Sequence, residues 1–194
     1  MAEPASKLSY STPEAYLEAE SASSSRHEYQ DGLILDMAGG SIAHERICAN
    51  LYGTLYNQLA GKPCSYFSSN MKLHVQAAHA FYYPDASVIC GEPQRYPGRE
   101  DALTDATVII EVLSPSTEAQ DRGEKFMSFQ LLPGLMEYVL IHQRRIRAEI
   151  YQRQQAGHWL YKQVNPGELL TLDSIQVSFP LDILYQGVQP DSAP

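Results

Sequence analysis

Two acidic residues stand inside stretches that otherwise have the composition of buried strands. Asp85 interrupts the apolar and aromatic run 81–89, and Glu111 interrupts the run 108–113. An unpaired carboxylate in an apolar setting costs several kcal/mol or shifts its pKa, so both side chains need a partner. A divalent cation is such a partner, because hard cations take carboxylate oxygens as ligands. The pattern therefore predicts a metal site at Asp85 and Glu111.

The same two residues fall opposite each other if the two runs pair as antiparallel strands. Paired residues in such a ladder have a constant sum of residue numbers, and the sum for Asp85 and Glu111 centres the pair on Gly98, in the turn-like sequence 96–99. Directly opposite residues share a face, with Cβ atoms about 4.5–5.5 Å apart. This register predicts that both carboxylates reach one ion.

A lysine follows on the next predicted helix. Lys125 lies one helical turn after Asp121, so the two side chains share a face. At the edge of the sheet, a lysine would orient a water molecule or stabilise the negative charge that develops on a phosphoryl group. The alternative is an exposed ion pair between Asp121 and Lys125, which would contribute little to stability.

Hydrophobic periodicity predicts the elements that must position these groups. The Thr12-Pro13 pair begins a helix that runs to about Ser21, and apolar residues at every fourth position from Ile47 to Leu59 predict a longer helix over 41–60. A third helix is expected over 118–132. Strands are expected over 33–37, 71–76, 81–90, 106–113, 137–141, 147–152, 159–164 and 169–177, with the second, third and fourth forming an antiparallel meander.

This order predicts the fold class. A helix, three strands, a helix and a strand, with extra strands at the N- and C-terminal ends, are typical of an α/β (α+β) fold in which helices flank a mixed β-sheet. The chain has 194 residues, which fits a single domain over 1–185 followed by a polar tail over 186–194.

Charge and cysteine content exclude several classes of protein. The formal net charge of −9 confines any nucleic-acid contact to a local basic strip. No apolar run approaches the roughly 18 residues of a membrane span, and the N-terminus lacks a signal-peptide core, so we expect a cytoplasmic protein without a membrane partner. Cys48, Cys64 and Cys90 form no C-x-x-C pair, which predicts free thiols and neither a disulfide framework nor a zinc ribbon.

One dense basic segment stands out in this acidic chain. Within residues 142–147, Arg144, Arg145 and Arg147 have the spacing and chemistry to bind phosphate oxygens. A solvated hairpin that balances the acidic charge explains the segment equally well. A zinc site is not expected from the histidines that share no ligand spacing with one another or with the cysteines, namely His74, His79, His142 and His158.

Taken together, these residues resemble the PD-(D/E)XK nuclease superfamily, and specifically its Uma-type restriction endonuclease family. The resemblance extends over about residues 29–151. The segments that carry it are Met37-Ala38-Gly39-Gly40-Ser41, His44, Ser69-Asn70-Met71-Lys72, Tyr83-Pro84-Asp85, Glu111-Val112-Leu113-Ser114-Pro115-Ser116-Thr117 and Asp121-Arg122-Gly123-Glu124-Lys125.

The resemblance implies a restriction-endonuclease-like core and a metal-dependent phosphodiesterase that uses Mg²⁺ or Mn²⁺. It implies Asp85 and Glu111 as catalytic residues and metal ligands. The superfamily pattern has a lysine two positions after the second acid, where this chain has Leu113, so Lys125 would take the role of catalytic lysine. The auxiliary site residues it suggests are Glu28, His44 and Asp121.

Two functions from different classes follow. The first is an endonuclease that hydrolyses DNA phosphodiester bonds, as a homodimer suited to a two-fold symmetric duplex. The second is a catalytically weak or inactive nuclease-fold protein that binds DNA or regulates, which the absent lysine at position 113 and the acidic charge favour. A glycosidase with Asp85 and Glu111 as its acid pair fits less well, because it would need a sugar-stacking cleft and no metal.

Overall fold

The computed structural model describes residues 7–8, 11–37 and 39–189. The helices are α1 (Pro13–Ala22), α2 (Ile42–Gln58), α3 (Glu118–Gln120), the π-helical segment η2 (Asp121–Lys125) and α4 (Phe126–Phe129), with short 3-10 helices η1 (Gln76–Ala78), η3 (Gln155–Gly157), η4 (Asp173–Ile175) and η5 (Leu181–Tyr185). The strands are β1 (Lys7–Leu8), β2 (His27–Gln30), β3 (Leu33–Asp36), β4 (Cys64–Ser68), β5 (Lys72–Val75), β6 (Ala80–Tyr82), β7 (Ala86–Cys90), β8 (Ala102–Leu103), β9 (Val108–Leu113), β10 (Glu137–His142), β11 (Ala148–Arg153), β12 (Trp159–Val164), β13 (Leu169–Leu172) and β14 (Val177–Pro180).

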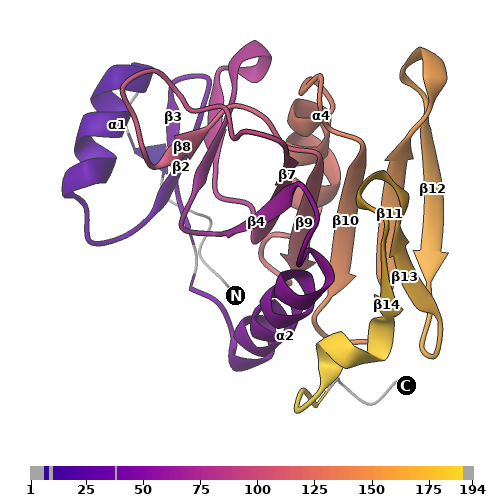
Figure 1. The fold of residues 1–194 in the computed structure, drawn as a ribbon. Coiled ribbons are helices and arrows are strands. Elements are labelled where there is room, and N and C mark those ends of the chain that lie inside the picture. Colours follow the sequence, from indigo (N-terminus) through magenta and orange to yellow (C-terminus); the bar gives the residue numbers. More distant parts are fainter. Residues whose placement is uncertain (1–6, 9–10, 38, 190–194) are drawn as a thin grey trace.

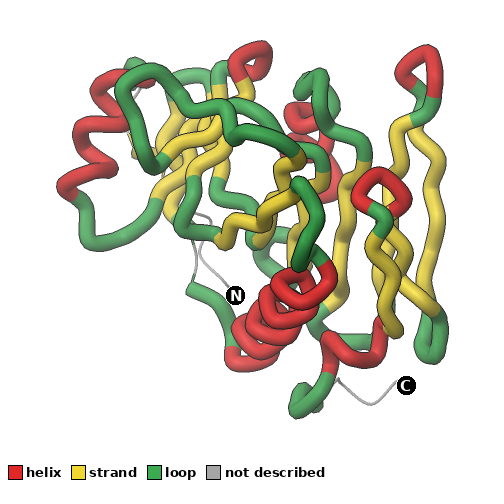
Figure 2. Tube along the Cα trace, viewed as in Figure 1, coloured by secondary structure: helices red, strands yellow, loops and turns green. Residues whose placement is uncertain are grey.

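Within these residues, two six-stranded mixed sheets form the framework (Figures 1 and 2). The central sheet has the order β12-β11-β10-β9-β7-β4, and the N-terminal sheet has the order β1-β3-β2-β6-β5-β8. In the central sheet only β9 and β10 run parallel to each other. The mixed sheets flanked by helices confirm the predicted fold class.

The central strand β9 has both faces covered. Val108, Ile110 and Val112 pack in the core under α2 and the β13–β14 hairpin, whereas Ile109 and Leu113 pack in the core under α4. All six residues of β9 are buried, as expected for a strand in the middle of a covered sheet. Glu111 therefore occupies a position on the α4 face, between two apolar neighbours.

The long helix predicted over 41–60 is confirmed as α2. The Ser41 hydroxyl caps it by accepting a hydrogen bond from the His44 backbone at 3.1 Å. Ile47, Leu51 and Leu55 are fully buried against the central sheet, and Gly61 follows the helix with a φ of +78°, a backbone conformation that glycine adopts readily. The cap fixes where α2 begins, and so fixes the position of His44.

The predicted register between Asp85 and Glu111 is confirmed, but the predicted meander is wrong. The pairs Ala86↔Ile110 and Val88↔Val108 have the same number sum as Asp85 and Glu111. However, the run expected as one strand over 81–90 divides into β6 in the N-terminal sheet and β7 in the central sheet, because Pro84 lacks the N–H that a continuous ladder requires. The partner of β7 on its other side is β4, which hydrophobic patterning missed.

Two other predicted elements are interrupted. The helix expected over 118–132 ends at Phe129 and contains the π-helical segment Asp121–Lys125 in its middle. A short π turn inside a helix changes which face the following residues occupy. The strand expected over 169–177 is instead a hairpin, in which η4 joins β13 to β14.

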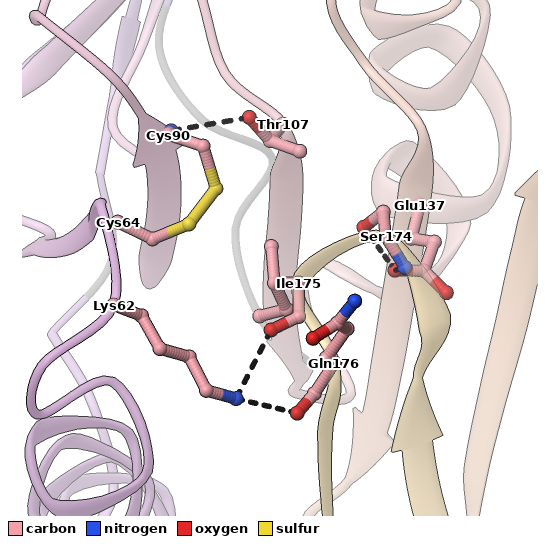
Figure 3. Close-up of a disulfide and its surroundings, with 8 residues drawn as sticks. All are labelled: Lys62, Cys64, Cys90, Thr107, Glu137, Ser174, Ile175 and Gln176. Atoms are coloured by element: carbon pink, nitrogen blue, oxygen red, sulfur yellow. Dashed lines mark hydrogen bonds between the residues drawn. A yellow bond between two sulfur atoms is a disulfide. The ribbon is translucent and has the colours of Figure 1, made fainter.

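The expectation of free thiols is wrong for two of the three cysteines. Cys64 and Cys90 are directly paired residues of β4 and β7 and form a disulfide (Figure 3). Their sequence separation of 26 hides the pair in the sequence, since only the strand register brings them together. Disulfides persist mainly in oxidising compartments, so the cysteines no longer support the cytoplasmic expectation, which stays a prediction.

The surroundings of the disulfide tie β4 and β7 to the rest of the molecule. The Cys90 backbone donates to the Thr107 hydroxyl at 3.3 Å. Just before β4, the Lys62 ammonium donates to the carbonyls of Ile175 and Gln176 at 3.2 and 2.5 Å, as Figure 3 shows. The edge of the central sheet is therefore fastened to the C-terminal hairpin.

The single domain over 1–185 stays a prediction, and the polar tail expected over 186–194 falls partly on residues 190–194, which lie outside the described residues. Across the described ranges, no helix combines the length and the apolar character that a membrane crossing requires.

The disulfide should contribute measurably to stability. Because it links residues 26 apart, chain-entropy arguments predict that a double Cys64→Ser, Cys90→Ser variant loses about 3.5 kcal/mol of unfolding free energy, measurable by urea denaturation without reductant. The wild-type protein in reductant should match the double variant. Equal stability of the variant and the oxidised wild type would contradict this pairing.

Candidate active site

Asp85 and Glu111 meet where the chain passes from one sheet to the other. Glu111 accepts a hydrogen bond from the backbone N–H of Asp85 at 3.1 Å, and Asp85 accepts one from the backbone N–H of Val112 at 2.7 Å. Each carboxylate is thus held by a backbone N–H group at or next to the other acid, at the end of the β7–β9 ladder. The Glu111 side chain is almost completely buried, whereas that of Asp85 is 17% exposed.

Lys125 lies among three carboxylates. Its ammonium nitrogen is 2.9 Å from Glu28 Oε1, 3.4 Å from Glu111 Oε1 and 3.4 Å from Asp121 Oδ1. The lysine and all three acids are buried. The alternative of an exposed pair between Asp121 and Lys125 is therefore wrong, because the pair belongs to a buried cluster that also includes Glu111.

Glu28 brings the N-terminal sheet into the site. It comes from β2, is buried, and accepts a hydrogen bond from the backbone of Tyr83 at 3.2 Å. Tyr83 precedes Pro84, where the chain crosses from the N-terminal sheet to the central sheet. Glu28 therefore approaches the cluster from the N-terminal sheet, and Asp85 approaches it from the central sheet. The auxiliary residue suggested from the sequence is thus in contact with the cluster.

His44 contacts Asp85 from the first turn of α2. Its Nε2 is 3.1 Å from Asp85 Oδ2, and the Tyr52 hydroxyl from the same helix donates to the Asp85 carbonyl at 2.7 Å. Burial lowers the pKa of His44, but the hydrogen bond and the charge of Asp85 outweigh burial and raise that pKa above its ordinary value. Helix α2 thereby fixes both the backbone and the side chain of Asp85.

The cluster holds more negative than positive charge. Among the described residues, the ammonium of Lys125 faces the carboxylates of Glu28, Glu111 and Asp121, with Asp85 beside them. Burial raises the pKa of Glu111 well above its ordinary value, although Lys125 partly opposes the rise. Burial lowers the pKa of Lys125, yet the surrounding carboxylates raise it well above the ordinary value, so the lysine stays protonated.

This donor set fits a hard divalent cation. The available ligand atoms are carboxylate oxygens, which Mg²⁺ and Mn²⁺ prefer. Asp121 Oδ1 is buried and has no hydrogen-bond partner among the described residues. One lysine balances only part of the negative charge of these carboxylates, so a bound cation would compensate the remainder.

A cavity of about 90 Å³ opens onto the cluster. Asp85, Glu111 and Lys125 line it, together with Gly39 and Gly40 from the segment before α2. Its wall also includes Ser114 and Thr117, from the loop after β9, and Arg26 and Ser69. The site is thus open to a small part of a larger ligand, such as one phosphodiester group.

Arg26 is a cavity residue that sequence reasoning missed. Its Nη1 donates to the Ser69 carbonyl at 2.6 Å and to the Ser69 hydroxyl at 3.1 Å, which anchors an otherwise exposed side chain. The signal was its position two residues before Glu28, since alternate residues of a strand share a face. Arg26 adds a cation on the side of the cavity formed by the N-terminal sheet.

The predicted basic strip divides into two groups. Arg144 and Arg145 are exposed in the turn after β10, and the preceding Gln143 accepts a hydrogen bond from Ser41 at 2.8 Å. That hydrogen bond places the turn beside the start of α2, near His44. Arg147 is half-buried and pairs with Glu149 at 3.3 Å.

Arg122 is a second residue that the sequence did not indicate. It follows Asp121 in the π-helical segment and binds the Glu149 carboxylate of β11 through two nitrogens, at 2.5 and 3.0 Å. His142 and Arg147 contact the same carboxylate. This network anchors the segment that presents Asp121 and Lys125 to the central sheet.

The order of elements and their packing define a nuclease fold. The crystal structure titled as a "putative nuclease belonging to DUF820" from Anabaena variabilis has a TM-score of 0.75 to this chain at 16% identity, covering 92% of this chain and 99% of that one. The chain belongs to the Uma2 family, described as "Putative restriction endonuclease", whose model matches residues 13–183.

Two relatives from Synechocystis sp. are similar to this chain in sequence. One uncharacterised protein is 35% identical over 177 residues, which is 91% of this chain and 92% of the relative. Another is 34% identical over 149 residues, which is 77% of this chain and 84% of that relative. The family membership confirms the resemblance found in the sequence.

The raised pKa of Glu111 predicts a pH dependence of stability. A carboxyl whose pKa is higher in the folded than in the unfolded chain loses stability as pH rises above about 4.3, the ordinary glutamate value. In metal-free buffer, the Glu111→Gln variant should therefore gain stability relative to the wild type as pH increases. Thermal denaturation between acidic and mildly basic pH measures this difference, and parallel curves for the two proteins would contradict it.

Proposed function

We propose that this chain is a metal-dependent endonuclease that hydrolyses DNA phosphodiester bonds. The observation that carries the proposal is the contact of the Lys125 ammonium with Glu111, beside Asp85, in a buried cluster that opens onto a cavity. Family membership supports the nuclease class. The metal, the catalytic roles and the DNA substrate are part of the proposal.

Asp85 and Glu111 would hold Mg²⁺ or Mn²⁺, because their carboxylates converge through shared backbone hydrogen bonds. A divalent ion bound there supplies Lewis-acid polarisation of a phosphoryl oxygen. His44 keeps the Asp85 carboxylate oriented through its hydrogen bond. Glu28 and Asp121 surround the lysine and so fix the position of its ammonium group.

Lys125 would act as a cation and not as a base. Its surrounding carboxylates keep it protonated, so it can donate hydrogen bonds to a water molecule or to the negative charge that develops on the phosphoryl group. Protonated lysine cannot accept a proton from the attacking water. The lysine therefore orients and stabilises, while a carboxylate or bulk solvent receives the proton.

Position 113 explains why the lysine comes from a helix. Leu113 is buried in the apolar core under α4, where a charged side chain would be costly. Lys125 from the neighbouring helix brings its ammonium to Glu111 instead. Because Lys125 supplies the positive charge that position 113 lacks, we favour an active enzyme over a catalytically weak or inactive nuclease-fold protein.

DNA would approach with phosphates on two sides of the cavity. Arg26 lies on one wall, and Arg144 and Arg145 lie on the turn beside the start of α2. Guanidinium groups are suited to phosphate oxygens. We retain Arg147 as a weaker phosphate contact, and a homodimer as the assembly suited to cutting both strands of a duplex.

Lys125 gives the sharpest test of the proposed chemistry. A Lys125→Met variant keeps most of the apolar stem and removes the charge, so turnover of DNA in Mg²⁺ should fall about 10²-fold or more. DNA affinity should change much less. Lys162→Met is the matched control, since Lys162 lies on β12 and pairs with Asp173 on the surface. Wild-type turnover by Lys125→Met would contradict the catalytic role of the lysine.

The arginines give a test of the proposed DNA-binding surface. Removal of one arginine–phosphate interaction should reduce the slope of log affinity against log salt by about 0.9. An Arg144→Gln, Arg145→Gln double variant removes two such interactions, so it should reduce the slope by roughly 1.8. The single variant Arg26→Gln should reduce it by about 0.9. Fluorescence anisotropy with labelled duplex in chelator measures binding without cleavage.

The control for this test is Arg95→Gln. Arg95 is an exposed residue that pairs with Glu100, so its variant should leave the slope unchanged. An unchanged slope in both of the other variants would contradict this DNA-binding surface.

A further inference from the structure

A different set of ligand atoms lies next to the proposed magnesium site. One ligand atom from each of His44, Cys48 and Asp85 lies within 4.8 Å of the other two. His44 and Cys48 are four residues apart on α2, and no other histidine of this chain has that spacing from a cysteine. The set combines nitrogen, sulfur and oxygen, which differs from the oxygen ligands that Mg²⁺ takes.

The separations suit a tetrahedral transition metal. His44 Nδ1 is 3.7 Å from Cys48 Sγ. Zinc bonds of about 2.0–2.1 Å to nitrogen and 2.3 Å to sulfur, at a tetrahedral angle, place those two ligand atoms about 3.6 Å apart. A metal ion therefore fits between the two side chains with little movement of α2.

Glu45 offers a further oxygen donor on the open side of His44. Its Oε1 is 3.8 Å from His44 Nδ1, and its side chain is 72% exposed. Because Glu45, His44 and Asp85 all line the cavity, an ion from solvent can reach this position. Zinc sites that open to solvent in proteins have three protein ligands of such mixed type.

We propose that His44 Nδ1, Cys48 and Glu45 form a second cation site, which binds a thiophilic divalent transition metal of the zinc class. Asp85 lies 3.1 Å from the other ring nitrogen, Nε2, where a carboxylate accepts the remaining N–H of a metal-binding histidine. Binding replaces the proton of the Cys48 thiol with a metal–sulfur bond and releases that proton to solvent. The hydrogen bond between His44 and Asp85 joins this site to the proposed magnesium site. An ion on Nδ1 keeps the ring proton of His44 on Nε2, where Asp85 accepts it, so zinc inhibits the nuclease by holding this carboxylate away from Mg²⁺.

The binding half of the proposal is tested without DNA. Co²⁺ is added to the purified full chain in non-reducing buffer, where Cys64 and Cys90 remain paired and Cys48 is the free thiol. We expect a near-ultraviolet cobalt–thiolate charge-transfer band that Zn²⁺ abolishes by displacing Co²⁺. A wild type without this band would overturn the site.

Variants assign the band to its ligands. Cys48→Ser should remove the thiolate band and weaken Zn²⁺ binding at least 10-fold in calorimetry, and Glu45→Gln should weaken it less. Cys48→Ala serves as a second variant if the serine disturbs the buried position, with circular dichroism as the check of folding. Unchanged zinc affinity in a folded Cys48 variant would overturn the proposal.

The inhibitory half rests on the proposed function. Zn²⁺ added to a cleavage reaction in Mg²⁺ should inhibit the wild type, and Cys48→Ser should require at least 10-fold more Zn²⁺ for the same inhibition. A cobalt–thiolate band in a protein that never cleaves DNA would defeat the nuclease proposal and leave the metal site standing. Cleavage with equal zinc sensitivity in wild type and Cys48→Ser would defeat the inhibitory role alone.

Discussion

The rest of the site depends on one buried ion cluster, in which the Lys125 ammonium lies within 3.4 Å of Glu28, Glu111 and Asp121. Buried charges are costly unless they are paired and hydrogen-bonded. The lysine is contributed by the helical segment, Glu111 by the central sheet and Glu28 by the N-terminal sheet. A single charge therefore links three parts of the fold, and each part has to be in place for the other two to remain buried.

The core explains how the acids keep their positions. Strand β9 alternates between two apolar cores, so Glu111 has no freedom to turn to another face. Asp85 stands at the end of β7, where the crossing at Pro84 stops the ladder and frees backbone donors for carboxylates. Helix α2 covers this point with His44 and Tyr52. Polar groups collect where the regular hydrogen bonding of the sheet ends.

Much of this arrangement could be predicted from the sequence. The apolar spacing of α2, the acids within the apolar runs 81–89 and 108–113 and the constant number sum are local patterns. They predicted α2, the pairing and the position of Asp85 opposite Glu111. Glu28, His44, Asp121 and Lys125 were named as candidates and the structure brings them together, although their roles stay predictions. The order of the expected elements predicted the fold class, and the resemblance to a nuclease family implied the same core.

The remainder depended on contacts between distant segments. Cys64 and Cys90 are paired only through the register of β4 and β7, and the division of the run 81–90 between two sheets reflects tertiary packing around Pro84. The π-helical segment left no periodic signal, because a single wide turn shifts a helical pattern without ending it. Arg122 gained its partner only through the fold, since Glu149 lies on a strand that follows much later in the chain.

Because Lys125 lies on a helix, the position of the cation and the positions of the paired acids depend on different elements of the fold. The backbone N–H groups that hold Asp85 and Glu111 belong to Asp85, just before β7, and to Val112 of β9, and they involve no atom of the helix. The cation, by contrast, depends on α3, the π-helical segment and the Arg122 anchor on β11. Loss of the lysine would therefore leave the hydrogen bonds of the paired acids intact but remove their compensating charge. The acids would keep their positions and change their protonation, since a buried carboxylate without a partner takes up a proton.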